Sequence, residues 1–151
     1  MSATTTVEHL SRHVGQTVTL KGWVYNRTSK GKLHFVQLRD GTGTVQCVLF
    51  KDSVPAELFA VVEKCGQESS VILEGAVRED KRAPGGFEIS VSGGSVLQAV
   101  EGYPITPKEH GPDFLLNHRH LWLRSRRQWA IMRVRDAVGL GRSVDSRRWP
   151  L

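Results

Sequence analysis

The 151-residue sequence contains only two cysteines, Cys47 and Cys65. Two cysteines cannot form the disulfide framework of a small secreted domain, and their spacing matches no zinc motif. Both lie among apolar neighbours, so we expect buried free thiols in a reducing cytoplasm. Three histidines near the C-terminal third also lack partner cysteines, so no metal site is expected. They are His110, His118 and His120.

Long apolar runs are missing as well. No stretch approaches the roughly 20 residues of a membrane span, and the segment 1–15 lacks the apolar centre of a secretory signal. We therefore expect a cytoplasmic protein without a membrane segment. Glycine-rich phosphate loops, nucleophile elbows and metalloprotease motifs are also absent. The sequence thus predicts no catalytic residue and no cofactor in this chain.

The charge is distributed unevenly along the sequence. The chain carries 21 basic and 15 acidic side chains, a formal net charge of +6. Residues 1–118 hold 12 basic and 13 acidic groups, whereas residues 119–151 hold nine arginines and two aspartates. The stretch 21–39, however, contains five basic residues and no acidic one. A local basic cluster of this kind is what contact with phosphates requires.

Strands are predicted at 33–39 and 44–50, joined by the turn sequence DGTG. The period of two places Phe35 and Gln46 opposite the apolar face of these strands. That apolar face consists of Val36, Leu38, Val45, Cys47 and Leu49. A phenyl ring among polar groups offers a stacking surface for a base, and an amide both donates and accepts hydrogen bonds. The alternatives are that Phe35 covers an opening of the core and that Gln46 is an ordinary surface residue.

The order of predicted elements is three strands, one helix and two strands. A strand at 17–25 precedes the two above, and the last two strands lie within 69–80 and 85–100. The helix lies within 53–67, and Gly66 suits its end. Its predicted core face consists of Leu58, Val61, Val62 and Cys65. This order is typical of an all-β OB-fold with one helix, a five-stranded barrel. Gly22 is a candidate bulge in the first strand.

The composition of the sequence changes after the last predicted strand. Prolines and glycines make residues 102–124 a connector, and a helix is predicted at 125–138, where Gly139 and Gly141 weaken it. We therefore divide the chain into an OB-fold at 1–101, a hinge at 102–124 and the start of another domain at 125–151.

Two stretches carry a resemblance to a known family. Residues 13–50 resemble the first three strands of the anticodon-binding OB domain of aspartyl/asparaginyl-type class II aminoacyl-tRNA synthetases, and residues 103–124 resemble their hinge. The hinge is more similar to the asparaginyl type. The resemblance covers residues 7–138 and implies the N-terminal part of an asparagine–tRNA ligase, cut before the catalytic motifs. ATP and magnesium belong to those motifs, so this chain alone is expected to be inactive.

The resemblance also assigns roles to individual residues. It implies that Phe35 stacks on the central anticodon base, a uridine, and that Gln46 hydrogen-bonds the same base. Arg27 is matched to a contact with the anticodon region, and Glu88 to the reading of the first anticodon base. The partner implied is a tRNA with the anticodon GUU. Contacts to the RNA backbone are assigned to Lys30 and Lys32.

Three alternatives to this interpretation stay open at the level of the sequence. The chain could be a free-standing OB module that binds tRNA or single strands, or it could be a fragment of an aspartate–tRNA ligase. It could also be an interaction piece that dimerises through the arginine-rich helix, since full-length members of the family are homodimers.

Overall fold

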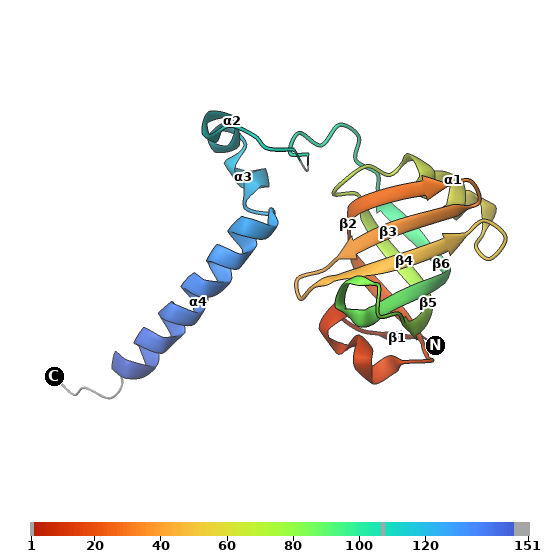
Figure 1. Ribbon diagram of the computed structural model, residues 1–151, viewed down its shortest axis with the longest axis horizontal. Helices are drawn as coiled ribbons and strands as arrows, with labels where there is room; N and C mark the ends of the chain where they lie inside the picture. Colours follow the sequence, from red (N-terminus) through yellow and green to blue (C-terminus); the bar gives the residue numbers. More distant parts are fainter. Residues whose placement is uncertain (1, 107, 147–151) are drawn as a thin grey trace. The chain divides into compact units, whose positions relative to one another are not determined.

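Strands with alternating apolar and polar side chains close into a five-stranded barrel (Figure 1). The strand order is β2-β3-β4-β6-β5, and β5 also pairs with β2, which closes the ring. β4 and β6 are parallel, and the other neighbours in the ring are antiparallel. This arrangement confirms the predicted OB-fold. The strands are β2 (Thr17–Lys30), β3 (Leu33–Arg39), β4 (Thr44–Phe50), β5 (Ser70–Glu79) and β6 (Phe87–Gln98).

The computed structural model describes residues 2–106 and 108–146. The chain divides into two units, Met1–Tyr103 and Pro104–Leu151. The first unit holds the barrel, and the second holds three helices.

The interior of the barrel is filled by apolar side chains of one parity from each strand. Burying a valine or leucine side chain stabilises a fold by about 1.5–3 kcal/mol, so this interior is the main source of stability. Both cysteines belong to it as free thiols, as the sequence predicts. Fully buried members include Val18, Leu20, Val36, Leu38, Val45, Cys47, Leu49, Leu73 and Ile89.

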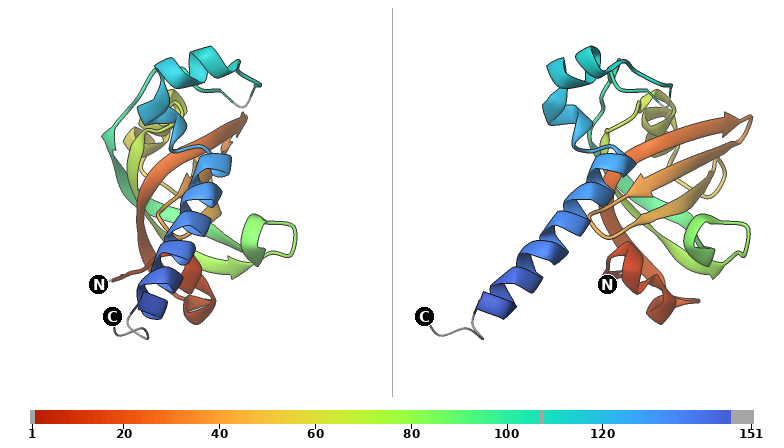
Figure 2. Two further views of the ribbon diagram at one scale, coloured as in Figure 1. Left: turned by 90° about the vertical axis from the view of Figure 1, so that its left-hand side faces the viewer. Right: turned by 60° about the vertical axis from the view of Figure 1, so that its left-hand side comes forward.

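β2 is long enough to pair with two neighbours. Its first half pairs with β5 and its second half with β3, and the strand curves around the barrel (Figure 2). The register of β2 shifts between Val24 and Asn26, so the prediction of a bulge at Gly22 is wrong. Gly22 stays in register opposite Val71. A Cβ atom there would lie 2.5 Å from the carbonyl oxygen of Arg39, so close backbone approach is what requires glycine.

The helix α1 (Ala56–Lys64) packs on the core through Leu58, Phe59 and Val62. The predicted core position Val61 is 42% exposed, and Phe59 is buried in its place. The apolar run 58–62 is compatible with two helix faces, and the contact with the barrel selects one of them. Gly66 does not form the cap: the cap residue is Cys65, and a Cβ on Gly66 would meet the carbonyl oxygen of Val100 at 2.4 Å.

An N-terminal segment for which no local pattern predicts a helix or strand covers part of the barrel. The short strand β1 (Ala3–Thr4) pairs in parallel with β2, and the 3-10 helix η1 (Val7–His13) buries Leu10 in the core. Asp40 holds this helix, because its carboxylate accepts a hydrogen bond from the Val7 backbone N–H at 2.8 Å. The same carboxylate accepts the Thr42 and Gly43 N–H groups of the following turn.

The second unit consists of α2 (Pro112–Asn117), α3 (Arg119–Trp122) and α4 (Arg126–Ser146). The predicted connector thus contains two short helices, and α4 continues through Gly139 and Gly141. Residues 147–151 of the predicted third segment lie outside the described residues. None of the helices in the described part of the chain is both long and apolar enough to cross a membrane. Exposed apolar side chains on α4 are Trp129, Ile131, Met132, Val134, Val138 and Leu140.

Candidate nucleic-acid interface

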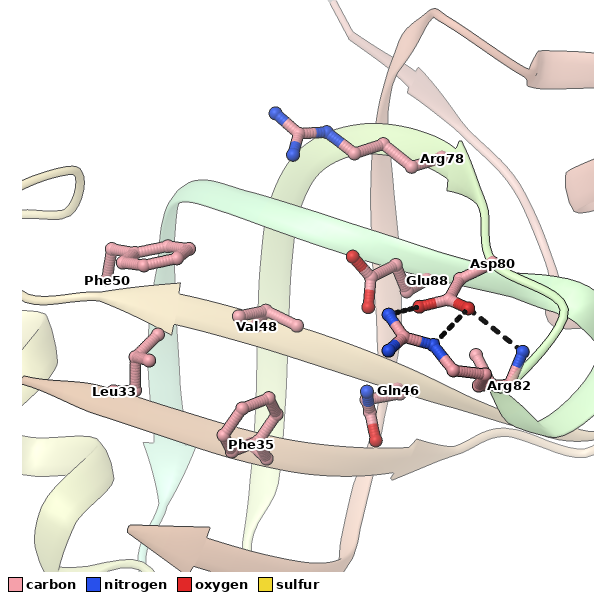
Figure 3. A pocket seen from close by; sticks show the side chains of 10 residues that line it. Leu33, Phe35, Gln46, Val48, Phe50, Arg78, Asp80, Arg82 and Glu88 are labelled. Atoms are coloured by element: carbon pink, nitrogen blue, oxygen red, sulfur yellow. Dashed lines mark hydrogen bonds and ion pairs between the residues drawn. The ribbon is translucent and has the colours of Figure 1, made fainter. Parts of the chain in front are cut away.

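A groove of about 490 Å³ lies against the outer face of β3 and β4 (Figure 3). One end is apolar, and the other end carries charged and amide side chains. The apolar end is formed by Leu33, Phe35, Val48 and Phe50, which we name the apolar quartet. The polar end is formed by Gln46, Arg78, Asp80, Arg82 and Glu88.

Strand pairing brings the apolar quartet together. Phe35 lies opposite Val48, and Leu33 lies opposite Phe50, in the antiparallel register of β3 and β4. The flanking residues of Phe35 on β3, His34 and Val36, are buried, which fixes its side chain on the outer face. The quartet is therefore a two-by-two patch of apolar groups on a rigid sheet.

Gln46 joins the apolar quartet to the polar end. It pairs with Gln37 on β3 and with Glu88 on β6. Glu88 in turn pairs with Arg78 on β5. Gln46, Glu88 and Arg78 thus occupy neighbouring positions on three adjacent strands, and Phe35 lines the same groove.

The loop between β5 and β6 forms the rim of the polar end and projects from the barrel in both views of Figure 2. Arg82 donates from Nε and Nη2 to the Asp80 carboxylate at 3.2 and 3.1 Å. These hydrogen bonds hold the pKa of Asp80 below its ordinary value. Gly85 and Gly86 adopt φ angles of 79° and 81° in the turn η2 (Pro84–Gly86) that ends this loop.

Of the residues predicted from the sequence to contact the anticodon, three line the groove and one lies outside it. Phe35, Gln46 and Glu88 line the same groove. Arg27 does not line it: its Nε donates to the carbonyl oxygen of Cys65 at 3.1 Å and its Nη1 to Ser29 Oγ at 2.6 Å. Arg27 pairs with Val36, a residue of the inner face, whereas Phe35 pairs with Thr28.

The two predicted lysines lie where β2 turns into β3. Lys30 and Lys32 are both exposed. The ammonium of Lys32 is 3.7 Å from the Asp52 carboxylate, and both side chains are about four-fifths exposed. Such a surface pair contributes little to stability, so Lys32 is free to exchange this partner for a phosphate.

Sequence reasoning missed Phe50, Arg78, Asp80 and Arg82 as groove residues. Phe50 has the same parity as Gln46 on its strand, so alternation alone could have found it. The other three reach the groove only because β6 pairs with β4 and carries the β5–β6 loop to this face. No local pattern in the sequence indicates that pairing.

The groove offers stacking, hydrogen bonding and charge, but no metal-binding chemistry. Within residues 2–106 and 108–146, no group of three or more His, Cys, Asp or Glu side chains could hold a metal ion. An aromatic platform beside an amide and charged groups is the combination with which OB-folds hold unpaired bases.

Relatives of the chain share this architecture. Asparagine–tRNA ligase from Chloroflexus aurantiacus is 55% identical over 135 residues, which are 89% of this chain and 31% of that protein. The enzyme of the same name from Symbiobacterium thermophilum is 53% identical over 133 residues, 88% of this chain and 30% of that protein. The crystal structure of asparaginyl-tRNA synthetase from Pyrococcus horikoshii has a TM-score of 0.85 and 40% identity, over 93% of this chain and 34% of that one.

The chain spans about a third of the length of these relatives. Residues 18–97 match the family described as OB-fold nucleic acid binding domain, of the tRNA anticodon type. This range includes every residue that lines the groove and all but the first residue of β2 and the last of β6. The match covers more than half of the chain, and the chain belongs to this family of tRNA anticodon-binding OB-fold domains.

Proposed function

We propose that this chain is the anticodon-recognition part of an asparagine–tRNA ligase and that the groove on β3 and β4 receives the anticodon loop. The observation that carries the proposal is the position of Phe35, Gln46 and Glu88. These residues come from three different strands, and all three line one groove. The identity of more than half with asparagine–tRNA ligases over this region supports the same function.

The central anticodon base stacks on Phe35 in this proposal. Stacking of a base on an aromatic side chain is worth about 1–3 kcal/mol and is insensitive to which base it is. Discrimination comes from Gln46, whose carboxamide offers one acceptor and two donor hydrogens to the edge of the base. A uridine presents both a carbonyl and an N–H on that edge, so one amide can satisfy both.

Glu88 reads the first anticodon base from the neighbouring strand. An ionised carboxylate only accepts hydrogen bonds. It therefore suits guanine, which presents N–H donors on its Watson–Crick edge, and disfavours bases that present acceptors there. Because Glu88 is the strand partner of Gln46, the two side chains can recognise two consecutive bases.

Cations around the groove hold the RNA backbone without reading the sequence. Lys30 and Lys32 serve this role at the β2–β3 turn. Arg27 lies outside the groove, and we propose that it contacts the anticodon region from there by exchanging its hydrogen bonds to Cys65 and Ser29. Each phosphate contact of this kind makes binding weaker as the salt concentration rises.

The activity of the whole protein follows from its relatives. We propose that the full-length enzyme joins asparagine to tRNA, the reaction that its relatives are named for, and that this chain supplies the anticodon contacts. The family resemblance implies ATP and magnesium for that reaction, a homodimer and a cytoplasmic location. The residues described here provide a binding surface, and the activation of asparagine belongs to the catalytic domain of such an enzyme.

Binding of short anticodon stem-loops tests this function. Three loops with the anticodons GUU, GUC and an unrelated triplet are titrated against the 151-residue chain at fixed salt concentration. We expect the tightest binding for GUU and a loss of at least about fivefold with Phe35→Ala. Leu97→Ala serves as a control, because Leu97 is an exposed apolar residue on β6 that does not line the groove. Equal binding of all three loops contradicts the proposal, and a preference for GUC favours an aspartate–tRNA ligase.

A further inference from the structure

We propose that Phe50 is a second stacking platform of the groove and that it holds the third anticodon base. This inference rests on the proposed function and deepens it, since the resemblance assigns no residue of this chain to the third anticodon base. The position of Phe50 in the apolar quartet provides a second aromatic ring, beside Phe35, on which a second base can stack.

Phe50 is the last residue of β4 and lies two positions after Val48, on the same face of the strand. Because Phe35 pairs with Val48, Phe50 is its diagonal neighbour across the two strands. Diagonal neighbours on one face of a sheet are about 7–8 Å apart, which is within reach of aromatic side chains. Two rings at this separation can each hold one base of an RNA strand whose bases are splayed apart.

The core does not account for the position of the Phe50 ring. Its chain neighbour Leu49 is completely buried, whereas Phe50 is 44% exposed. The ring therefore lies on the outer face and lines the groove at its apolar end, as Figure 3 shows. A large aromatic group left open to water at the edge of a binding groove is available for a flat apolar ligand.

The order of the groove residues along β4 indicates which anticodon base would stack on Phe50. Along β4 the groove residues follow in the order Gln46, Val48, Phe50. Glu88 lies beside Gln46, at the end far from Phe50. If Glu88 takes the first base and Phe35 with Gln46 takes the central one, the next base in the same direction reaches Phe50.

Charges around Phe50 favour a nucleotide over an apolar peptide. Lys51 follows Phe50 directly, and its backbone N–H donates to the carbonyl oxygen of Lys32 at 3.0 Å. Both lysine side chains are exposed. The Lys32 ammonium lies 3.7 Å from the exposed Asp52 carboxylate, and a phosphate that replaces Asp52 there would place a nucleotide near the strand end that carries Phe50.

A cycle that combines protein and RNA changes tests the inference. The 151-residue chain and its Phe50→Ala variant are titrated with the GUU stem-loop and with the same loop made abasic at the third anticodon position. We expect Phe50→Ala to weaken binding of the intact loop by at least about fivefold. With the abasic loop, the variant and the original chain should bind alike. Phe50→Tyr, which keeps the ring, should bind the intact loop like the original chain.

The outcomes separate this inference from the proposed function. If Phe35→Ala weakens GUU binding but Phe50→Ala does not, Phe50 is no platform and the proposed function stands. If the effect of Phe50→Ala is lost with a loop abasic at the first or central position instead, the assignment to the third base is overturned. If the original chain does not prefer the GUU loop, the proposed function itself fails. Equal melting temperatures of the two variants and the original chain verify that all three are folded.

Discussion

Gln46 on β4 and Glu88 on β6 are direct partners across a parallel pair of strands. They are far apart in the sequence, and only the pairing of β6 with β4 brings them together. One side chain can both donate and accept hydrogen bonds, and the other, when ionised, can only accept them. Two groups with different hydrogen-bonding capacities therefore occupy neighbouring positions in the groove that Phe35 also lines.

This adjacency predicts separable effects on two bases. Glu88→Gln should weaken binding of the GUU stem-loop about tenfold, since a hydrogen bond to a charged group is worth about 1.5–3 kcal/mol. It should also reduce the preference for guanine over adenine at the first position, because an amide can pair with either. The preference for uridine at the central position should stay as it is. A loss of both preferences to the same extent would argue against separate roles.

The pair of Arg39 and Glu68 is predicted to be a main support of the barrel. Arg39 Nη2 donates to both Glu68 oxygens, at 2.7 and 2.8 Å, and the two side chains are only 16% and 8% exposed. Arg39→Met removes both hydrogen bonds and the opposite charge from a nearly buried carboxylate, so the free energy of unfolding should fall by about 3 kcal/mol. Urea denaturation measures this change.

The matched control for that variant is Arg82→Met. It removes an arginine that is also paired with a carboxylate, but one whose side chain is 91% exposed. Its free energy of unfolding should stay close to that of the original chain. Equal losses in the two variants would show that burial does not matter for these pairs.

His34 predicts a dependence of stability on pH. Its ring is buried, neither ring nitrogen has a hydrogen-bond partner, and it stacks on Phe59 at 3.9 Å. Burial lowers the pKa of His34, and the nearby Arg27 lowers it further, whereas Glu63 opposes this shift. Because the unfolded chain binds this proton more readily, stability should fall as the pH drops below about 6.5.

Thermal unfolding at pH values of about 7.5 and 5.5 measures this effect, since carboxylates stay ionised over that range. His34→Phe keeps the stacking with Phe59 and removes the titrating group. The loss of stability between the two pH values should therefore be smaller in this variant. An unchanged loss would assign the pH dependence to another group.

The close approach at Gly22 predicts a steric defect. A Cβ atom there would lie 2.5 Å from Arg39 O and 2.8 Å from Leu38 Cδ2. Gly22→Ala should therefore lower the free energy of unfolding by about 1–3 kcal/mol. Gly93→Ala is the control, because Gly93 lies in β6 and a Cβ there meets nothing within 4 Å. Comparable stabilities of the two variants would contradict the steric argument.

Local patterns in the sequence were sufficient for much of the fold. The period of two identified the inner and outer faces of β3 and β4, so Phe35 and Gln46 could be placed on the outer face, where the groove lies, from the sequence. The order of strands and helix then predicted the OB-fold. Both results depend on residues close together in the chain, where alternation and turn signals are informative.

Features that depend on distant residues could not be predicted in this way. Gly22 is required by the carbonyl of Arg39, and the buried face of α1 is selected by the barrel, which is why Phe59 rather than Val61 is buried. Likewise, Arg82 reaches the groove only through the β4–β6 pairing. Each of these features depends on a contact between segments that no local pattern reveals.

The central claim is that Gln46 selects uridine for a base stacked on Phe35. The most direct measurement compares the Kd for the GUU stem-loop with that for a loop whose central uridine is replaced by cytidine, using the original chain and the Gln46→Ala variant. The account predicts a preference for uridine in the original chain that largely disappears in the variant, while Phe35→Ala weakens both loops alike. Equal Kd values for the two loops with the original chain, or an undiminished preference in Gln46→Ala, would contradict it.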